Sequence, residues 1–263
     1  MCFSKLNAFL LTAFLFVATA LSSEASEPDK SQMDVATCHV KLDTPNAFRI
    51  LYIGDSITLH GTNAAVKSKL KWDHVAGMAA SEDSKDYAHL FAALIQETLP
   101  DRSVEIYYHT LGGSGAIAER LAAIDQIRGV EPHLVVIQLG EHEKVEDGIE
   151  TLRRNFDKLL KAFNSQKPPP RVLCVGPWSP PTVSGKSSYK GWTGQVQQVM
   201  QECCNSQRIP FVSVQDFAEN PDCRGWGESV GVQWHPNDKG HEGYARKLLD
   251  AYKSFPGPSA IFK

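Results

Sequence analysis

Short apolar runs alternate with stretches of helical periodicity along the sequence, and this alternation limits the folds open to the chain. The apolar runs cover residues 48–53, 104–108, 134–139, 172–175 and 211–214. Continuous apolar runs of this length are typical of strands that are buried on both faces of a parallel sheet. Apolar residues recur at helical spacing in residues 86–99, 145–163, 192–203 and 244–252. The pattern predicts an α/β fold, with helices on both faces of a parallel sheet.

Two connections are much longer than the roughly 2–6 residues that usually join the elements of such a sheet. Residues 57–85 follow the first apolar run, and residues 178–189, which are rich in proline, serine and glycine, follow the fourth. Both begin at the carboxyl end of a predicted strand, where open α/β sheets bind ligands. We therefore expect the two segments to border a ligand site.

The first 25 residues have the pattern of a secretory signal peptide. Lys5 precedes an uncharged apolar run at residues 8–21, and small residues occur at and before Ala20 and Ala25. The run is short for a membrane span, which needs about 20 apolar residues. We expect cleavage after Ala20 or Ala25, a flexible leader over residues 26–45 and one domain over residues 46–263. The expected protein is secreted or periplasmic, without stable membrane insertion; an uncleaved N-terminal anchor is the alternative.

The charge and the cysteines restrict the function classes further. A formal charge of -3 at pH 7 gives no electrostatic case for nucleic acid as a partner. In an oxidising compartment one or two disulfides are expected, for example Cys38 or Cys223 with Cys203 or Cys204. Cys174 lies inside an apolar run and is expected to be a buried free thiol. No cysteine pair has the spacing of a zinc or redox motif.

Candidate catalytic groups follow the first two predicted strands. Ser56 comes directly after the first strand, in Gly-Asp-Ser, where a side chain is placed as a nucleophile. A glycine-rich turn at residues 112–115 follows the second strand, and its backbone N–H groups can stabilise an oxyanion. The alternatives are an ordinary turn at Ser56 and a phosphate or nucleotide site at the glycines. The second alternative lacks the full dinucleotide-binding motif.

Two histidines stand at the same predicted edge of the sheet. His142 follows the third strand within Gly-Glu-His-Glu, and a metal site with Glu141 or Glu143 is one alternative, although no further ligands are evident. His235 precedes a proline, and its ordinary pKa of about 6.5 suits a general base at neutral pH. His241 is expected on the last helix, without a catalytic role.

Together and in this order, these motifs resemble those of the SGNH/GDSL hydrolase family over about 190 residues, from Phe48 to the final helix. The resemblance places Ser56 at the nucleophile, Gly112 at the oxyanion glycine and His235 at the catalytic base. His142 stands where the family has its oxyanion asparagine. The resemblance implies a flavodoxin-like three-layer αβα sandwich with a five-stranded parallel sheet of order 2-1-3-4-5. It also implies hydrolysis of carboxylic esters without a metal, nucleotide or other cofactor.

One position departs from the family pattern. The catalytic aspartate of the family lies three residues before the histidine, and Val232 occupies that position here. A backbone carbonyl would then orient His235 in a Ser–His dyad, which is the arrangement we expect. Completion of a triad by Glu228, Asp222 or Asp238 is the alternative.

The substrate is the least constrained part of the interpretation. Predicted export, together with Trp72, Trp178 and Trp192 near the expected mouth of the site, favours an O-acetyl group on a carbohydrate, because tryptophan rings suit sugar stacking. The expected partner is thus a small-molecule or polysaccharide ester. Acyl esters or thioesters of lipids are the enzymatic alternatives, and a catalytically degenerate carbohydrate-binding protein is the other.

Overall fold

The computed structural model describes residues 33–34, 44–181 and 191–255. The predicted signal peptide, most of the predicted leader, Cys38 and most of the loop at residues 178–189 lie outside these ranges. In the described ranges no helix is both long and apolar enough to cross a bilayer.

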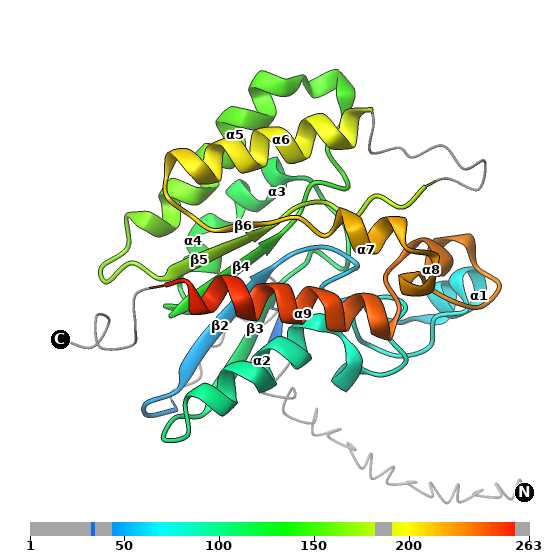
Figure 1. Cartoon of the computed structure of the whole chain (residues 1–263), viewed down its shortest axis with the longest axis horizontal. Coiled ribbons are helices and arrows are strands. Elements are labelled where there is room, and N and C mark those ends of the chain that lie inside the picture. Colours follow the sequence, from blue (N-terminus) through cyan, green and yellow to red (C-terminus); the bar gives the residue numbers. More distant parts are fainter. Residues whose placement is uncertain (1–32, 35–43, 182–190, 256–263) are drawn as a thin grey trace, which may run out of the picture.

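A single parallel sheet forms the centre of the molecule, with strands in the order β1-β3-β2-β4-β5-β6 (Figure 1). The strands are β1 (Met33–Asp34), β2 (Phe48–Ile53), β3 (Val104–His109), β4 (Leu134–Gln138), β5 (Arg171–Val175) and β6 (Phe211–Val212). Strands β2 to β6 confirm the predicted five-stranded order 2-1-3-4-5. The two-residue β1 lies inside the predicted leader and adds an unpredicted edge strand beside β3.

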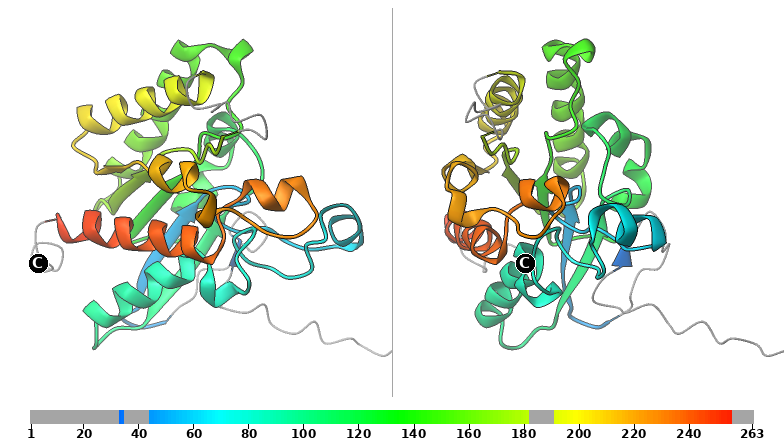
Figure 2. Two further views of the ribbon diagram at one scale, coloured as in Figure 1. Left: turned by 45° about the vertical axis from the view of Figure 1, so that its right-hand side comes forward. Right: turned by 90° about the vertical axis from the view of Figure 1, so that its right-hand side faces the viewer.

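Helices cover both faces of the sheet and complete the predicted three layers. They are α1 (Ala64–Leu70), α2 (Tyr87–Thr98), α3 (Ile117–Ala122), α4 (Ile124–Arg128), α5 (Ile149–Asn164), α6 (Trp192–Ser206), α7 (Gln215–Glu219), α8 (Val230–Trp234) and α9 (Asp238–Lys253). The described residues also form the short 3-10 helices η1 (Asp83–Lys85), η2 (Val145–Asp147) and η4 (Pro221–Cys223). Figure 2 shows α2 and α9 packed side by side.

The alternation of side chains along β2 explains the two cores. Leu51 and Ile53 are buried with α3, α4, α5 and α6 on one face, whereas Ile50 and Tyr52 are buried with α2 and α9 on the other. Helix α2 begins at Tyr87 because the Asp86 side chain accepts a hydrogen bond from the His89 N–H. Strands buried on both faces therefore account for the continuous apolar runs.

The cysteines show why one predicted disulfide is wrong. Cys174, Cys203 and Cys204 lie in the core that contains α5 and α6, whereas Cys223 lies in the opposite core. The sheet separates the two groups, so that Cys223 cannot pair with Cys203 or Cys204. All four are buried free thiols, which confirms the prediction for Cys174.

The long segment after β2 forms a small core of its own. Trp72, Met78 and Ala79 are buried there together with Val232, which belongs to α8. Helix α1 packs against α8, and both lie beyond the carboxyl ends of the strands (Figure 1). This segment therefore supports the helix that directly precedes His235.

Candidate active site

Ser56 and His235 meet at the carboxyl edge of the sheet. The Ser56 Oγ and the His235 Nε2 are 2.7 Å apart, although 179 residues separate the two in sequence. Ser56 lies in a turn directly after the central strand β2, and His235 is the residue that caps the end of α8. Their exposed fractions are only 8% and 7%. The fold thus brings the predicted nucleophile and the predicted base into hydrogen-bond contact.

A backbone carbonyl orients the His235 ring. The His235 Nδ1 lies 2.6 Å from the Gly231 oxygen, and since a carbonyl only accepts, Nδ1 carries the proton and donates. In the neutral ring Nε2 is then the acceptor that faces the Ser56 hydroxyl. Burial lowers the pKa of His235 to about 4, against the opposing effect of the Gly231 hydrogen bond. The ring is therefore neutral at pH 7, as a general base must be.

Of the three carboxylates considered for a triad, two are engaged elsewhere and the third is exposed. Asp238 accepts hydrogen bonds from the backbone N–H and the hydroxyl of Ser81, at 2.7 Å each. Asp222 forms an ion pair with Lys239, and Glu228 is exposed. The side chain of Val232 packs in the Trp72 core.

The glycine-rich turn lies against Ser56. A Cβ at Gly113 would lie 3.2 Å from the Ser56 Cα and 2.6 Å from the His60 ring, and the φ of Gly113 is +95°. A Cβ at Gly112 would instead meet no atom within 4 Å, so that this position borders open space. Among the described residues, neither the Ser56 N–H nor the Gly112 N–H has a hydrogen-bond partner. Two backbone donors are thus available at the site, as an oxyanion hole requires.

Arg120 joins this turn to the nucleophile strand. Its buried guanidinium donates to the Gly54 oxygen at 2.9 Å, to the Gly115 oxygen at 3.2 Å and to the Ser114 oxygen. The sequence pattern did not indicate this role, because an arginine in a short amphipathic helix is usually exposed.

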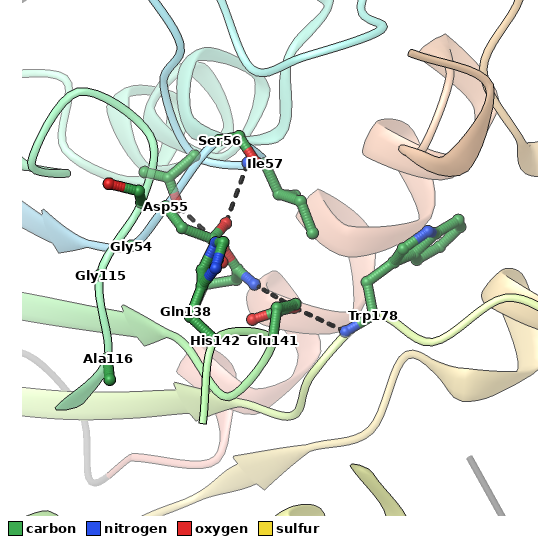
Figure 3. A network of polar contacts seen from close by, with 12 residues as sticks. Gly54, Asp55, Ser56, Ile57, Gly115, Ala116, Gln138, Glu141, His142 and Trp178 are labelled. Carbon is green, nitrogen blue, oxygen red and sulfur yellow. Dashed lines mark hydrogen bonds and ion pairs between the residues drawn. The ribbon is translucent and has the colours of Figure 1, made fainter. Parts of the chain in front are cut away.

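His142 lies beside Asp55, as Figure 3 shows. Its Nε2 is 3.7 Å from the Asp55 Oδ2, and 41% of its side chain is exposed. The part of the chain that the structure describes gives His142 no hydrogen bond. Nor does that part contain a group of three or more His, Cys, Asp or Glu side chains suited to a metal ion, so His142 with Glu141 or Glu143 forms no such group.

The tryptophan prediction is wrong for two of its three residues. Trp72 and Trp178 are fully buried, and their indole N–H groups donate to backbone oxygens, so neither ring can stack on a sugar. Trp192 is partly buried, and its Nε1 donates to the Glu143 oxygen. Apolar residues in long loops of this fold serve the core as readily as a binding surface.

Comparison with known proteins decides the family. Residues 52–242 match the GDSL-like lipase/acylhydrolase family. The chain belongs to this family. It is a carboxylic ester hydrolase, as the sequence motifs predicted. No curated protein matches this hydrolase.

Solved structures share its fold at low sequence identity. A putative GDSL-like lipase from Parabacteroides merdae is 15% identical, with a TM-score of 0.58, and the match covers 81% of this chain and 99% of that one. An acetyl xylan esterase from Geobacillus stearothermophilus is 16% identical, with a TM-score of 0.53 and coverage of 81% and 96%. A two-domain esterase active on acetylated mannans is 18% identical, with a TM-score of 0.55 and coverage of 81% and 52%.

Proposed function

We propose that this family member is an exported serine esterase that removes O-acetyl groups from carbohydrate, with Ser56 as nucleophile and His235 as base. The observation that carries the catalytic assignment is the 2.7 Å contact between Ser56 Oγ and His235 Nε2, in a ring whose Nδ1 is held by Gly231. A degenerate carbohydrate-binding protein has no need for this arrangement.

The proposed reaction is acyl transfer through a covalent intermediate. The His235 Nε2 takes the hydroxyl proton while the Ser56 Oγ attacks the ester carbonyl. The N–H groups of Ser56 and Gly112, with the ring of His142, stabilise the oxyanion. The His235 ring then gives its proton to the leaving alcohol, and the acetyl group stays on Ser56. A water molecule, deprotonated by His235, releases acetate and restores the hydroxyl.

The proposed dyad uses the Gly231 carbonyl in place of the aspartate. The carbonyl fixes the tautomer and the direction of the ring, which are two tasks of that aspartate in a triad. It carries no full charge and so stabilises the imidazolium less than a carboxylate does. We therefore expect a working but moderate esterase.

The proposed substrate rests on the fold neighbours and on predicted export. Two of the neighbours are described as esterases of acetylated xylan or mannan. The buried positions of Trp72 and Trp178 remove the support that these two tryptophans gave. Lipid acyl esters and thioesters are the classes against which acetylated sugars must be tested.

A pair of serine variants tests the nucleophile. Purified protein, Ser56→Ala and Ser165→Ala are assayed with an aryl acetate and labelled with a fluorophosphonate probe. Ser165 is the matched control, because it is exposed and its hydroxyl donates to the Ala162 oxygen at the end of α5. We expect Ser56→Ala alone to lose both turnover and labelling. Equal rates for Ser56→Ala and the unmodified protein would refute the assignment.

A substrate panel tests the acyl group and its carrier. Acetylated xylo-oligosaccharide, a long-chain aryl ester and an acyl thioester are compared at equal enzyme concentration. The proposal requires the highest kcat/KM on the acetylated sugar.

Sequencing the N-terminus of the mature protein tests export. The first residue is expected to be residue 21 or 26, and a mature protein that begins at residue 1 would contradict export.

A further inference from the structure

Two carboxyl groups lie close to Ser56: Asp55 is buried, and Glu141 is partly buried with its Oε2 enclosed. Asp55 precedes Ser56 and is 1% exposed, and Glu141 follows β4 by three residues. Each carboxyl group shifts the pKa of the other, so the two lie close together, and each has one buried oxygen without a hydrogen-bond partner among the described residues. Figure 3 shows Glu141 between Gln138 and Trp178, on the side of the nucleophile turn. The esterase mechanism above uses neither carboxyl group.

Each carboxyl group has one oxygen with ordinary donors and one without. The Asp55 Oδ1 accepts from the Ile57 N–H at 3.0 Å, and the Glu141 Oε1 accepts from the Gln138 amide and the Trp178 N–H at 2.7 Å each. Among described residues, the Asp55 Oδ2 and the Glu141 Oε2 receive no hydrogen bond from any N–H or O–H donor outside the pair. Two buried acceptors in contact repel each other, and a proton between them removes the conflict.

The surroundings decide which residue holds that proton. Burial raises the pKa of Asp55, but the Ile57 N–H and the nearby His142 and Arg120 oppose that rise and favour its ionised form. For Glu141, burial and then the Asp55 charge raise the pKa well above its ordinary value, and none of the main influences on it is a cation of the described residues. The phenols of Tyr87 and Tyr244 also face the pair, and burial raises their pKa values, so they stay neutral. His60 feels the charge of Asp55 as well, but burial lowers its pKa.

We propose that Asp55 and Glu141 share one proton, which Glu141 holds as a neutral carboxylic acid and donates to the Asp55 carboxylate. Glu141 is then a positioning residue. Through Asp55 it holds the turn that carries Ser56, and through its Oε1 it holds the end of β4 and the backbone at Trp178. This role in positioning rests on the proposed function, whereas the shared proton does not.

The shared proton has an electrostatic consequence for the reaction. The pair carries one negative charge in place of two, close to the place where the ester oxygen becomes negative. A second charge would oppose oxyanion formation and would act strongly in this buried environment. The two carboxyl groups beside Ser56 therefore oppose oxyanion formation only as strongly as one negative charge would.

The substitutions Glu141→Gln and Glu141→Ala test the proposal. Glutamine reproduces a neutral acid, because its oxygen accepts from Gln138 and Trp178 while its NH₂ donates to Asp55. Alanine removes every one of these bonds. Glu143→Gln is the matched control, since Glu143 is a half-buried carboxyl two residues away whose Oε1 accepts from the Ile117 N–H. Infrared spectra of the full-length variants at about pH 8 report the carbonyl stretch of a protonated carboxylic acid.

The expected results separate this proposal from the esterase proposal. The protonated-acid band should be present in the unmodified protein and in Glu143→Gln, and absent from Glu141→Gln. Glu141→Gln should keep kcat within about threefold and lose any alkaline decline of the rate due to the pair, whereas Glu141→Ala should lose about tenfold or more. The same band in Glu141→Gln, or equal losses with glutamine and alanine, would overturn the proposal. The infrared result needs no turnover, so it stands even if Ser56 is not the nucleophile.

Discussion

Lowering the pH from about 7 to about 5.5 should leave kcat/KM almost unchanged, because His235 remains a neutral base in that range. With its pKa lowered to about 4 by burial, the ring is roughly 97% neutral at pH 5.5. With the ordinary histidine pKa of about 6.5 it would be roughly 9% neutral at the same pH. The two cases differ about tenfold in rate, and the difference grows at lower pH.

The measurement is kcat/KM for an acetylated sugar between about pH 3.5 and 8 at constant ionic strength. Released acetate is quantified by chromatography, since the signal of a phenolic product changes with pH. A control sample is returned from each pH to pH 7, and recovered activity shows that the fold survived. A midpoint of the acid limb near pH 4 is expected. A midpoint between about pH 6 and 7 would refute the conclusion that burial sets the protonation of the base.

The lowered pKa of His235 also makes the free energy of unfolding depend on pH. The unfolded chain binds a proton at His235 with a pKa of about 6.5, whereas the folded protein binds it only near pH 4. The His235 contribution to the free energy of unfolding is therefore at its maximum above about pH 6.5. It declines as the pH falls towards 4, by at most about 3 kcal/mol. Denaturant titrations at about pH 7 and pH 4.5 measure the decline.

Three substitutions probe the rest of the site. His142→Ala should lower kcat by about 10²–10³ with KM little changed, and His142→Asn should recover much of the rate because its amide also donates; a silent alanine variant would remove His142 from the oxyanion hole. Val232→Asp should not increase kcat, because the side chain at this position packs in the buried core around Trp72. It should lower the unfolding free energy in a denaturant titration by about 3 kcal/mol or more. A faster variant would show that a carboxylate reaches His235 from this position. Gly113→Ala should lower both kcat and the melting temperature, because its Cβ meets the backbone of the nucleophile. Gly148→Ala, at a φ of +75° where no atom lies within 4 Å of an added Cβ, should cost about 1–3 kcal/mol from backbone strain alone and no activity. Equal losses of activity in the two alanine variants would contradict the role of close packing.

The sequence predicted those parts of the fold that depend on local pattern. Strand β2 begins and ends where the apolar run does, and the motif residues Ser56 and His235 meet because each follows an element that ends at the same edge of the sheet. The last strand is shorter than predicted and ends at Val212, because Val214 already caps α7.

Features that depend on packing across the sheet could not be predicted from the sequence. The pairing of Cys223 with Cys203 was wrong because sequence spacing does not show on which face of the sheet a cysteine lies. Glu141 entered the sequence analysis only as a metal ligand, since a carboxyl group in a polar motif gives no sign of its burial. The Gly231 carbonyl agrees with the expected dyad, but a backbone group leaves no signature in the residue types.

If His235 is the base, its orientation by a main-chain oxygen changes which mutations inactivate this hydrolase. One nucleotide change can delete an aspartate, whereas the carbonyl at position 231 is present whichever amino acid the codon specifies. Its direction, however, depends on the path of α8, and a Cβ at Gly231 would lie 3.3 Å from the Leu70 Cδ2 at the end of α1. In a saturation mutagenesis library, inactivating substitutions should therefore extend into the α1–α8 contact, among residues that never meet the substrate. Selection for activity then acts on the packing of α1 against α8, whereas in a triad it acts on the aspartate side chain.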